Sequence, residues 1–134
     1  TLVNAALAAD DGYAELLRPA ASPNASSLNP TDGVQHIVNF DGADRVKVKK
    51  TSLPTLMREY GIDKISLLKM DCEGCEYEVI RATPTNILKR IDSMILEYHD
   101  GPKDLPSLLS RAGFTVSSSH TEPLGLLRAW RAHQ

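Results

Sequence analysis

The sequence of 134 residues has no long apolar run. No segment approaches the roughly 20 apolar residues that span a bilayer. The first residues also lack the basic and then apolar layout of a signal peptide. These absences predict a cytoplasmic protein that has no membrane partner.

The sequence also lacks a concentrated basic patch. Fifteen Lys and Arg residues stand against seventeen Asp and Glu residues, which gives a net charge of -2. The basic residues are scattered along the sequence, and their main grouping is Lys47, Lys49 and Lys50. A protein that binds nucleic acid neutralises many phosphates with such residues, so we expect no nucleic-acid partner. The hydrophobic share of 42% and the charged share of 24% are typical of a globular domain, and residues 1–134 are expected to form a single one.

A glycine-rich nucleotide loop is missing as well. The eight glycines never occur as Gly-x-Gly, the pattern that opens the first helix of dinucleotide-binding α/β domains.

Cysteine is scarce, and its two copies, Cys72 and Cys75, form a C-x-x-C pattern. A thioredoxin-like redox pair is one interpretation, but the neighbouring acids Asp71, Glu73 and Glu76 would raise the pKa of the thiols, which opposes redox catalysis. A structural zinc site needs further ligands, and neither His99 nor His120 has a suitable spacing. We therefore expect two small packing residues.

Strand-like and helix-like patterns alternate along the chain. Residues 19–33 are rich in Pro, Ser, Asn and Asp and predict a mobile loop. The alternation predicts an α/β fold whose sheet is mostly parallel, with an antiparallel pair of strands at its C-terminal edge. We expect strands over 1–8, 13–17, 46–50, 65–70, 92–99, 114–120 and 124–132, and helices over 52–61, 76–89 (broken at Thr83-Pro84) and 105–112.

The run at residues 65–70 is almost wholly apolar, as in a strand that is covered on both faces. Lys69 lies within it. A buried ammonium group needs a partner, so we expect Asp71 or Glu97 to pair with Lys69.

Acidic residues and a histidine follow two of the predicted strands. Asp71, Glu73 and Glu76 come at the end of the first, and Glu97 and His99 at the end of the second. Ligands of open α/β sheets bind outside the carboxyl ends of the strands, so these side chains are expected to share a pocket. Taken singly, each has a structural explanation, because acids favour the first turn of a helix and His99 can be a solvated strand end.

Four stretches together resemble the FkbM family of S-adenosylmethionine-dependent methyltransferases. The family signature has the form Lys, apolar, Asp, small, Glu-Gly, small, Glu, and its polar positions match Lys69, Asp71, Glu73, Gly74 and Glu76. The Glu and His that end the family's next strand correspond to Glu97 and His99. The stretches are 51–57 (TSLPTLM), 69–76 (KMDCEGCE), 96–99 (LEYH) and 112–114 (AGF).

The resemblance implies a partial Rossmann-like methyltransferase sheet that is truncated at its N-terminus. Residues 1–8 would be the third strand of the usual sheet, and the first two strands, with the cofactor loop, would lie upstream. The sheet would then be split, and residues 1–17 would pair elsewhere, stay loose or be completed by another chain. An exposed sheet edge invites strand addition, so a homodimer through that edge is expected.

The resemblance also implies roles for the residues of the site. The reaction would be O-methylation of a small molecule or sugar, with Asp71, His99 and Glu97 as catalytic residues. His99 would remove the acceptor's proton, because imidazole takes up protons near neutral pH.

Further roles follow from the same resemblance. Asp71 and Glu73 would contact S-adenosylmethionine, and Glu76 and Lys69 would contact the acceptor. A divalent metal on Asp71, Glu73, Glu97 and His99 is a less favoured alternative. Because the glycine-rich loop is absent, we expect the isolated chain to be inactive. The alternative function is a catalytically inactive fragment or binding module that retains the acceptor half of the fold.

Overall fold

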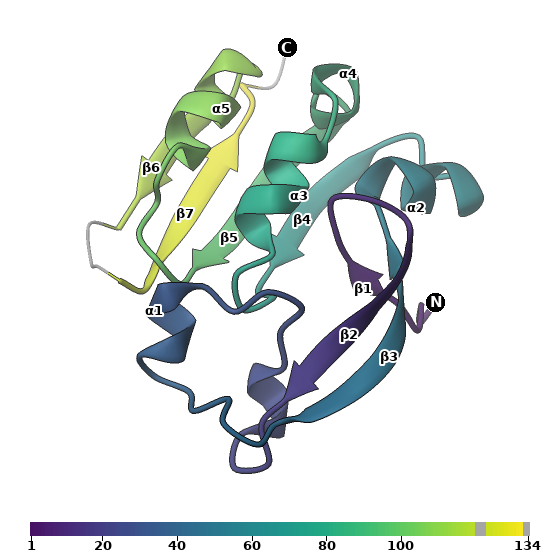
Figure 1. Ribbon diagram of the computed structural model, residues 1–134. Helices are drawn as coiled ribbons and strands as arrows, with labels where there is room; N and C mark the ends of the chain where they lie inside the picture. The colour runs from purple at the N-terminus through teal and green to yellow at the C-terminus, as the bar shows by residue number, and fades with distance from the viewer. Residues whose placement is uncertain (120–122, 133–134) are drawn as a thin grey trace.

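The computed structural model describes residues 1–119 and 123–132 and contains two β-sheets (Figure 1). The first has the order β1-β3-β2, with β1 (Ala6–Leu7), β2 (Gly12–Arg18) and β3 (Asp44–Thr51). The second has the order β4-β5-β7-β6, with β4 (Ile65–Met70), β5 (Ile91–Tyr98), β6 (Thr115–Ser118) and β7 (Gly125–Trp130). The fold is therefore α/β, as predicted.

Strand directions in both sheets are mixed, so the prediction of a mostly parallel sheet is wrong. Of the five pairings between named strands in the described residues, only β1 with β3 and β4 with β5 are parallel. The connection from β6 to β7 is too short for a parallel crossover, which needs a dozen or more residues. Strand β7 lies between β5 and β6 and is antiparallel to both, which confirms the predicted antiparallel pair. Residue 120, the last of the strand predicted over 114–120, and the two residues after it lie outside the described residues.

The N-terminal segment pairs within the smaller sheet. The strand predicted over residues 1–8 is only two residues long, whereas β2 extends beyond the predicted 13–17. Both strands pair with β3, and neither belongs to the sheet that contains β4. The expected split of the sheet is therefore present.

The predicted loop at residues 19–33 contains local structure. A 3-10 helix, η1, spans Pro23–Ala25, and α1 (Asp32–Gln35) begins near the end of the segment. The Thr31 hydroxyl accepts a hydrogen bond from the Val34 N–H, as is common at a helix start. Mobility of the segment stays a prediction.

The longer helices begin and end where the sequence patterns indicate. Helix α2 (Leu53–Glu59) follows Ser52, whose hydroxyl accepts the Thr55 N–H at 3.4 Å. The predicted helix over 76–89 is broken into α3 (Glu76–Ala82) and α4 (Thr85–Leu88), because Pro84 cannot continue the first helix. Helix α5 (Leu105–Arg111) stops before Gly113, whose φ of +90° suits a C-terminal cap.

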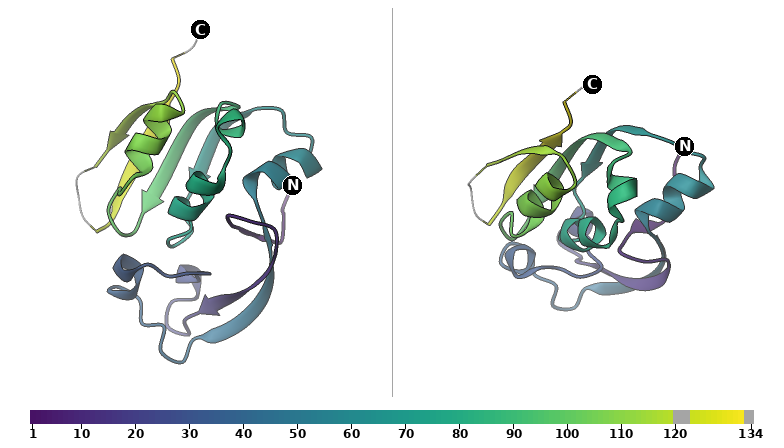
Figure 2. Two further views of the ribbon diagram at one scale, coloured as in Figure 1. Left: turned by 45° about the horizontal axis from the view of Figure 1, so that its top comes forward. Right: turned by 90° about the horizontal axis from the view of Figure 1, so that it is seen from above.

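Helices α3 and α5 cover one face of the larger sheet (Figure 2). The side chains between them and the strands form the main core, which includes Met94, Leu96, Tyr98, Leu105 and Leu127. In the described part of the chain, no helix is both long and apolar enough to cross a membrane.

The opposite face of this sheet, here called the open face, comprises Leu67 and Lys69 of β4, Ile95 of β5, and Leu126 and Trp130 of β7. Leu67 is 55% exposed, and Leu126 and Trp130 are also exposed. The expectation that β4 is covered on both faces is therefore wrong. Strand β4 is also an edge strand, and a homodimer through an edge stays a prediction.

Candidate active site

The predicted acidic cluster lies at the carboxyl ends of β4 and β5. These strands are parallel neighbours, with Met70 opposite Leu96, and their ends point toward α1 (Figure 1). His99 Nε2 lies 3.3 Å from Glu73 Oε2 and 4.0 Å from Asp71 Oδ1. The structure thus brings together three of the predicted site residues, Asp71, Glu73 and His99.

His99 is buried rather than solvated, with only 7% of its side-chain surface exposed. Its Nδ1 atom has no hydrogen-bond partner among the described residues. Gly33 of α1 lies directly against the His99 backbone, since a Cβ atom at Gly33 would be 1.6 Å from the His99 carbonyl oxygen. Helix α1 therefore covers the histidine, a contact that the sequence did not indicate.

Glu76 holds the turn between β4 and α3 together. Its side chain is fully buried, and its two carboxylate oxygens accept the Cys72 N–H at 2.8 Å and the Gly74 N–H at 3.1 Å. Burial raises the pKa of Glu76. Oε1 also lies 3.9 Å from His99 Nδ1. Glu76 thus shapes the turn, and its contact with the acceptor stays a prediction.

Glu73 has a left-handed backbone conformation, with φ of +53°. Such a conformation costs energy in a residue other than glycine and occurs often at functional sites. Its carbonyl oxygen accepts the Ser27 hydroxyl at 2.8 Å, which ties the turn to the 19–33 loop. Burial raises the pKa of Glu73, the charges of Asp71 and Glu97 raise it further, and His99 opposes the shift.

The Lys69 ammonium group pairs with Asp71 Oδ2 at 3.2 Å, which is one of the two predicted pairings. The expected burial of this lysine is wrong, because its side chain is 61% exposed on the open face. Glu97 is half-buried and forms no ion pair with another described residue. It therefore lies beside the cluster and not in it.

Cys72 and Cys75 form a disulfide bond within the turn, with their Cα atoms 5.4 Å apart. The expectation of two unlinked packing residues is therefore wrong. Both side chains still pack against the core. The tight turn around Gly74 brings the two residues together, so the disulfide closes the loop that carries Glu73.

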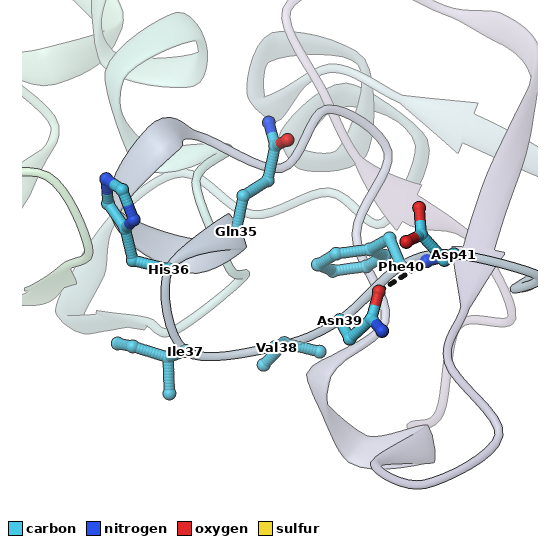
Figure 3. A pocket seen from close by; sticks show the side chains of 7 residues that line it. All are labelled: Gln35, His36, Ile37, Val38, Asn39, Phe40 and Asp41. Carbon is cyan, nitrogen blue, oxygen red and sulfur yellow. Dashed lines mark hydrogen bonds between the residues drawn. The ribbon is translucent and has the colours of Figure 1, made fainter.

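A cavity of about 270 Å³ opens beside His99 and Glu73. The remaining lining comes mainly from the 19–33 loop and from α1 with the residues after it: Ser22, Asn24, Ala25, Val34, Ile37 and Val38, together with Leu124. A larger hollow of about 440 Å³ is lined only by residues 35–41 (Figure 3). It contains none of the acidic cluster, so the smaller cavity is the candidate binding pocket.

The model of the FkbM methyltransferase domain matches residues 1–116. This range contains most of the chain and all three residues of the cluster. The chain belongs to the FkbM methyltransferase family. The FkbM signature residues Asp71 and Glu73 are thus the ones that meet His99.

Two curated relatives share parts of this FkbM domain. The hexuronic acid methyltransferase AglP of Haloferax volcanii is 35% identical over 79 residues, which are 58% of this chain and 32% of the relative. The methyltransferase sdnD of Sordaria araneosa is 29% identical over 94 residues, which are 62% of this chain and 36% of the relative. The chain thus spans about a third of each. No solved structure is significantly similar to it.

Tyr77 of α3 anchors the backbone beside His99. Its hydroxyl donates to the Gly101 carbonyl oxygen at 2.7 Å and accepts the Asp100 N–H at 3.0 Å. Burial raises the pKa of Tyr77 to about 12, so the phenol keeps the proton that it donates. Sequence reasoning missed this residue, because nothing in its spacing links it to Gly101.

Tyr77→Phe is expected to lower the free energy of unfolding by about 1–3 kcal/mol, because two backbone groups lose a buried partner. Urea unfolding measures the loss, and amide hydrogen exchange at Asp100 should become faster. Tyr60→Phe is the matched control, because Tyr60 is exposed. Equal stability of the two variants would contradict the anchoring role.

Proposed function

We propose that this domain forms the acceptor side of an S-adenosylmethionine-dependent O-methyltransferase. The observation that carries the proposal is the convergence of Asp71, Glu73 and His99 at the ends of β4 and β5, where Glu73 and His99 line one cavity. Asp71 and Glu73 are signature positions of the family, and His99 is its matching strand-end histidine. Membership of the family supports methyl transfer in general.

The arrangement suits deprotonation of an acceptor hydroxyl. S-adenosylmethionine would supply the methyl group: the bond from the acceptor oxygen to the methyl carbon would form as the carbon–sulfur bond breaks. The hydroxyl proton passes to His99 Nε2. The Glu73 carboxylate, 3.3 Å from that nitrogen, stabilises the imidazolium that results. Alignment of the two reactants contributes the rest of the rate enhancement.

The cavity supports an acceptor of modest size that carries hydroxyl groups. Its volume of about 270 Å³ is close to the lower end of small-molecule pockets. One relative is named for methylation of a hexuronic acid, which favours a sugar or sugar acid. Loop residues such as Ser22 and Asn24 supply polar groups for further hydroxyls.

His99→Asn tests this proposal in the full-length protein. Transfer of labelled methyl groups from S-adenosylmethionine to a panel of sugars and sugar acids is measured for both proteins. Loss of a general base lowers rates by about 10²- to 10⁴-fold, so we expect kcat to fall within that range. His36→Asn, which removes an exposed histidine, should leave kcat unchanged. A His99→Asn variant with wild-type kcat would refute the role of His99 as the base.

A further inference from the structure

We propose that Asp71, Glu73 and His99 bind a divalent transition-metal cation, of the Mn²⁺ or Zn²⁺ kind, through His99 Nε2 and one oxygen of each carboxylate. Binding of the cation does not depend on the proposed function. Its role in the reaction does rest on that function.

The spacing of the three ligand atoms suits one ion. One donor atom from each residue lies within 4.8 Å of the others, and His99 Nε2 is 3.3 Å from Glu73 Oε2 and 4.0 Å from Asp71 Oδ1. With metal–ligand bonds of about 2.0–2.2 Å, ligand atoms on one ion are about 3 to 4.4 Å apart. The side chains therefore need only small movements to close around a cation.

A carboxylate lies behind the histidine, where a metal-binding histidine usually has a hydrogen-bond partner. Such a residue donates its second N–H to a carboxylate or carbonyl, which fixes the ring. Here Nδ1 is buried without a hydrogen-bond partner among the described residues, and the buried Glu76 carboxylate lies 3.9 Å away. A small rotation of the ring would complete that hydrogen bond and leave Nε2 facing the two acids.

The charges around the site also favour a cation. Asp71 and Glu73 place their carboxylate oxygens 4.0 Å and 3.3 Å from His99 Nε2. Among the described residues, one basic side chain pairs with these acids. It is Lys69, which contacts Asp71 Oδ2. Asp71 Oδ1, which faces His99, is left for the ion.

The donor set indicates the class of metal. The imidazole suits Zn²⁺, and the two carboxylates suit Mn²⁺. Mg²⁺ and Ca²⁺ are usually bound by oxygen ligands throughout. Three protein ligands leave positions open for oxygens of the acceptor. A cation there would acidify a bound hydroxyl and would also neutralise the site toward a sugar acid. When the cation is bound, it takes the place of the proton on His99 Nε2. His99 is then a metal ligand and not the base.

The test is a calorimetric titration of the protein with MnCl₂ and then with ZnCl₂, without methyl donor or acceptor. His99→Asn and Glu73→Gln should abolish binding, and Glu76→Gln should weaken it by about 10- to 100-fold through loss of support. His36→Asn and Glu78→Gln, both at exposed positions, should bind like the wild type. The titrations are made without a reducing agent, so that the Cys72–Cys75 disulfide stays intact and offers no thiolate to the metal. Circular dichroism confirms that each variant is folded.

Failure of the wild type to bind either ion at millimolar concentration would overturn the proposal, as would full binding by the folded His99→Asn variant. Because these titrations use no methyl donor, their failure is separate from failure of the methyl-transfer assay. Activity that survives exhaustive chelation, together with sensitivity to His99→Asn, would assign His99 as the base and remove the catalytic role of the cation.

Discussion

Gly33→Ala is expected to destabilise the protein by about 1–3 kcal/mol or more, the usual range for overpacking a tightly packed site. The added Cβ atom would lie 1.6 Å from the carbonyl oxygen of His99, 2.7 Å from its carbonyl carbon and 3.1 Å from the Asp100 Cα. All three are backbone atoms, so no side-chain rotation can relieve the clash. Either α1 or the end of β5 must move, and both surround the candidate active site.

The measurement is the midpoint of urea unfolding, together with the methyl-transfer rate. Asp32→Ala is the matched control, because it changes the preceding, exposed residue of the same short helix. We expect this control to unfold near the wild-type midpoint. If Gly33→Ala unfolded at the same urea concentration as Asp32→Ala, α1 would not be packed on His99.

The second large effect is expected for Glu76→Ala. Removal of this buried carboxylate leaves the N–H groups of Cys72 and Gly74 without their partner. Each unsatisfied group costs about 1–3 kcal/mol, so the two groups together predict a loss of roughly 2–6 kcal/mol. The turn that carries Asp71 and Glu73 should loosen at the same time.

Glu76→Gln separates the shape of this side chain from its charge. The amide keeps the volume and one acceptor oxygen, so we expect a smaller loss of stability than for Glu76→Ala. Thermal unfolding measures both, with Glu78→Ala as the control at an exposed position of the same helix. An equal loss for Glu76→Ala and Glu78→Ala would show that the carboxylate does not hold the turn.

The sequence predicted those parts of the site that depend on local geometry. Residues 69 and 71 are two apart in an extended segment, so they lie on the same side, and the Lys69–Asp71 pair follows. The approach of His99 to Asp71 and Glu73 follows from two parallel strands that end at one edge. Periodicity and capping residues located the longer helices for the same reason.

The parts that failed depend on tertiary packing. An apolar run is typical of a strand covered on both faces, yet no residue pattern shows what covers Leu67 or Lys69. The antiparallel direction of β7 was predicted, but its position between β5 and β6 depends on packing that spacing does not reveal. Likewise, the packing of Gly33 on His99 joins segments that are remote in the sequence.

The insertion of β7 also determines where this domain can be cut. The family match ends at residue 116, inside β6, whereas β7 (Gly125–Trp130) comes later in the chain. A fragment that stopped at residue 116 would lack β7. Strand β5 would then pair with β4 alone, and β6 would lose the strand with which it pairs. Expression fragments designed from this family should therefore extend through residue 130, because the strand beyond the match completes the sheet that carries His99.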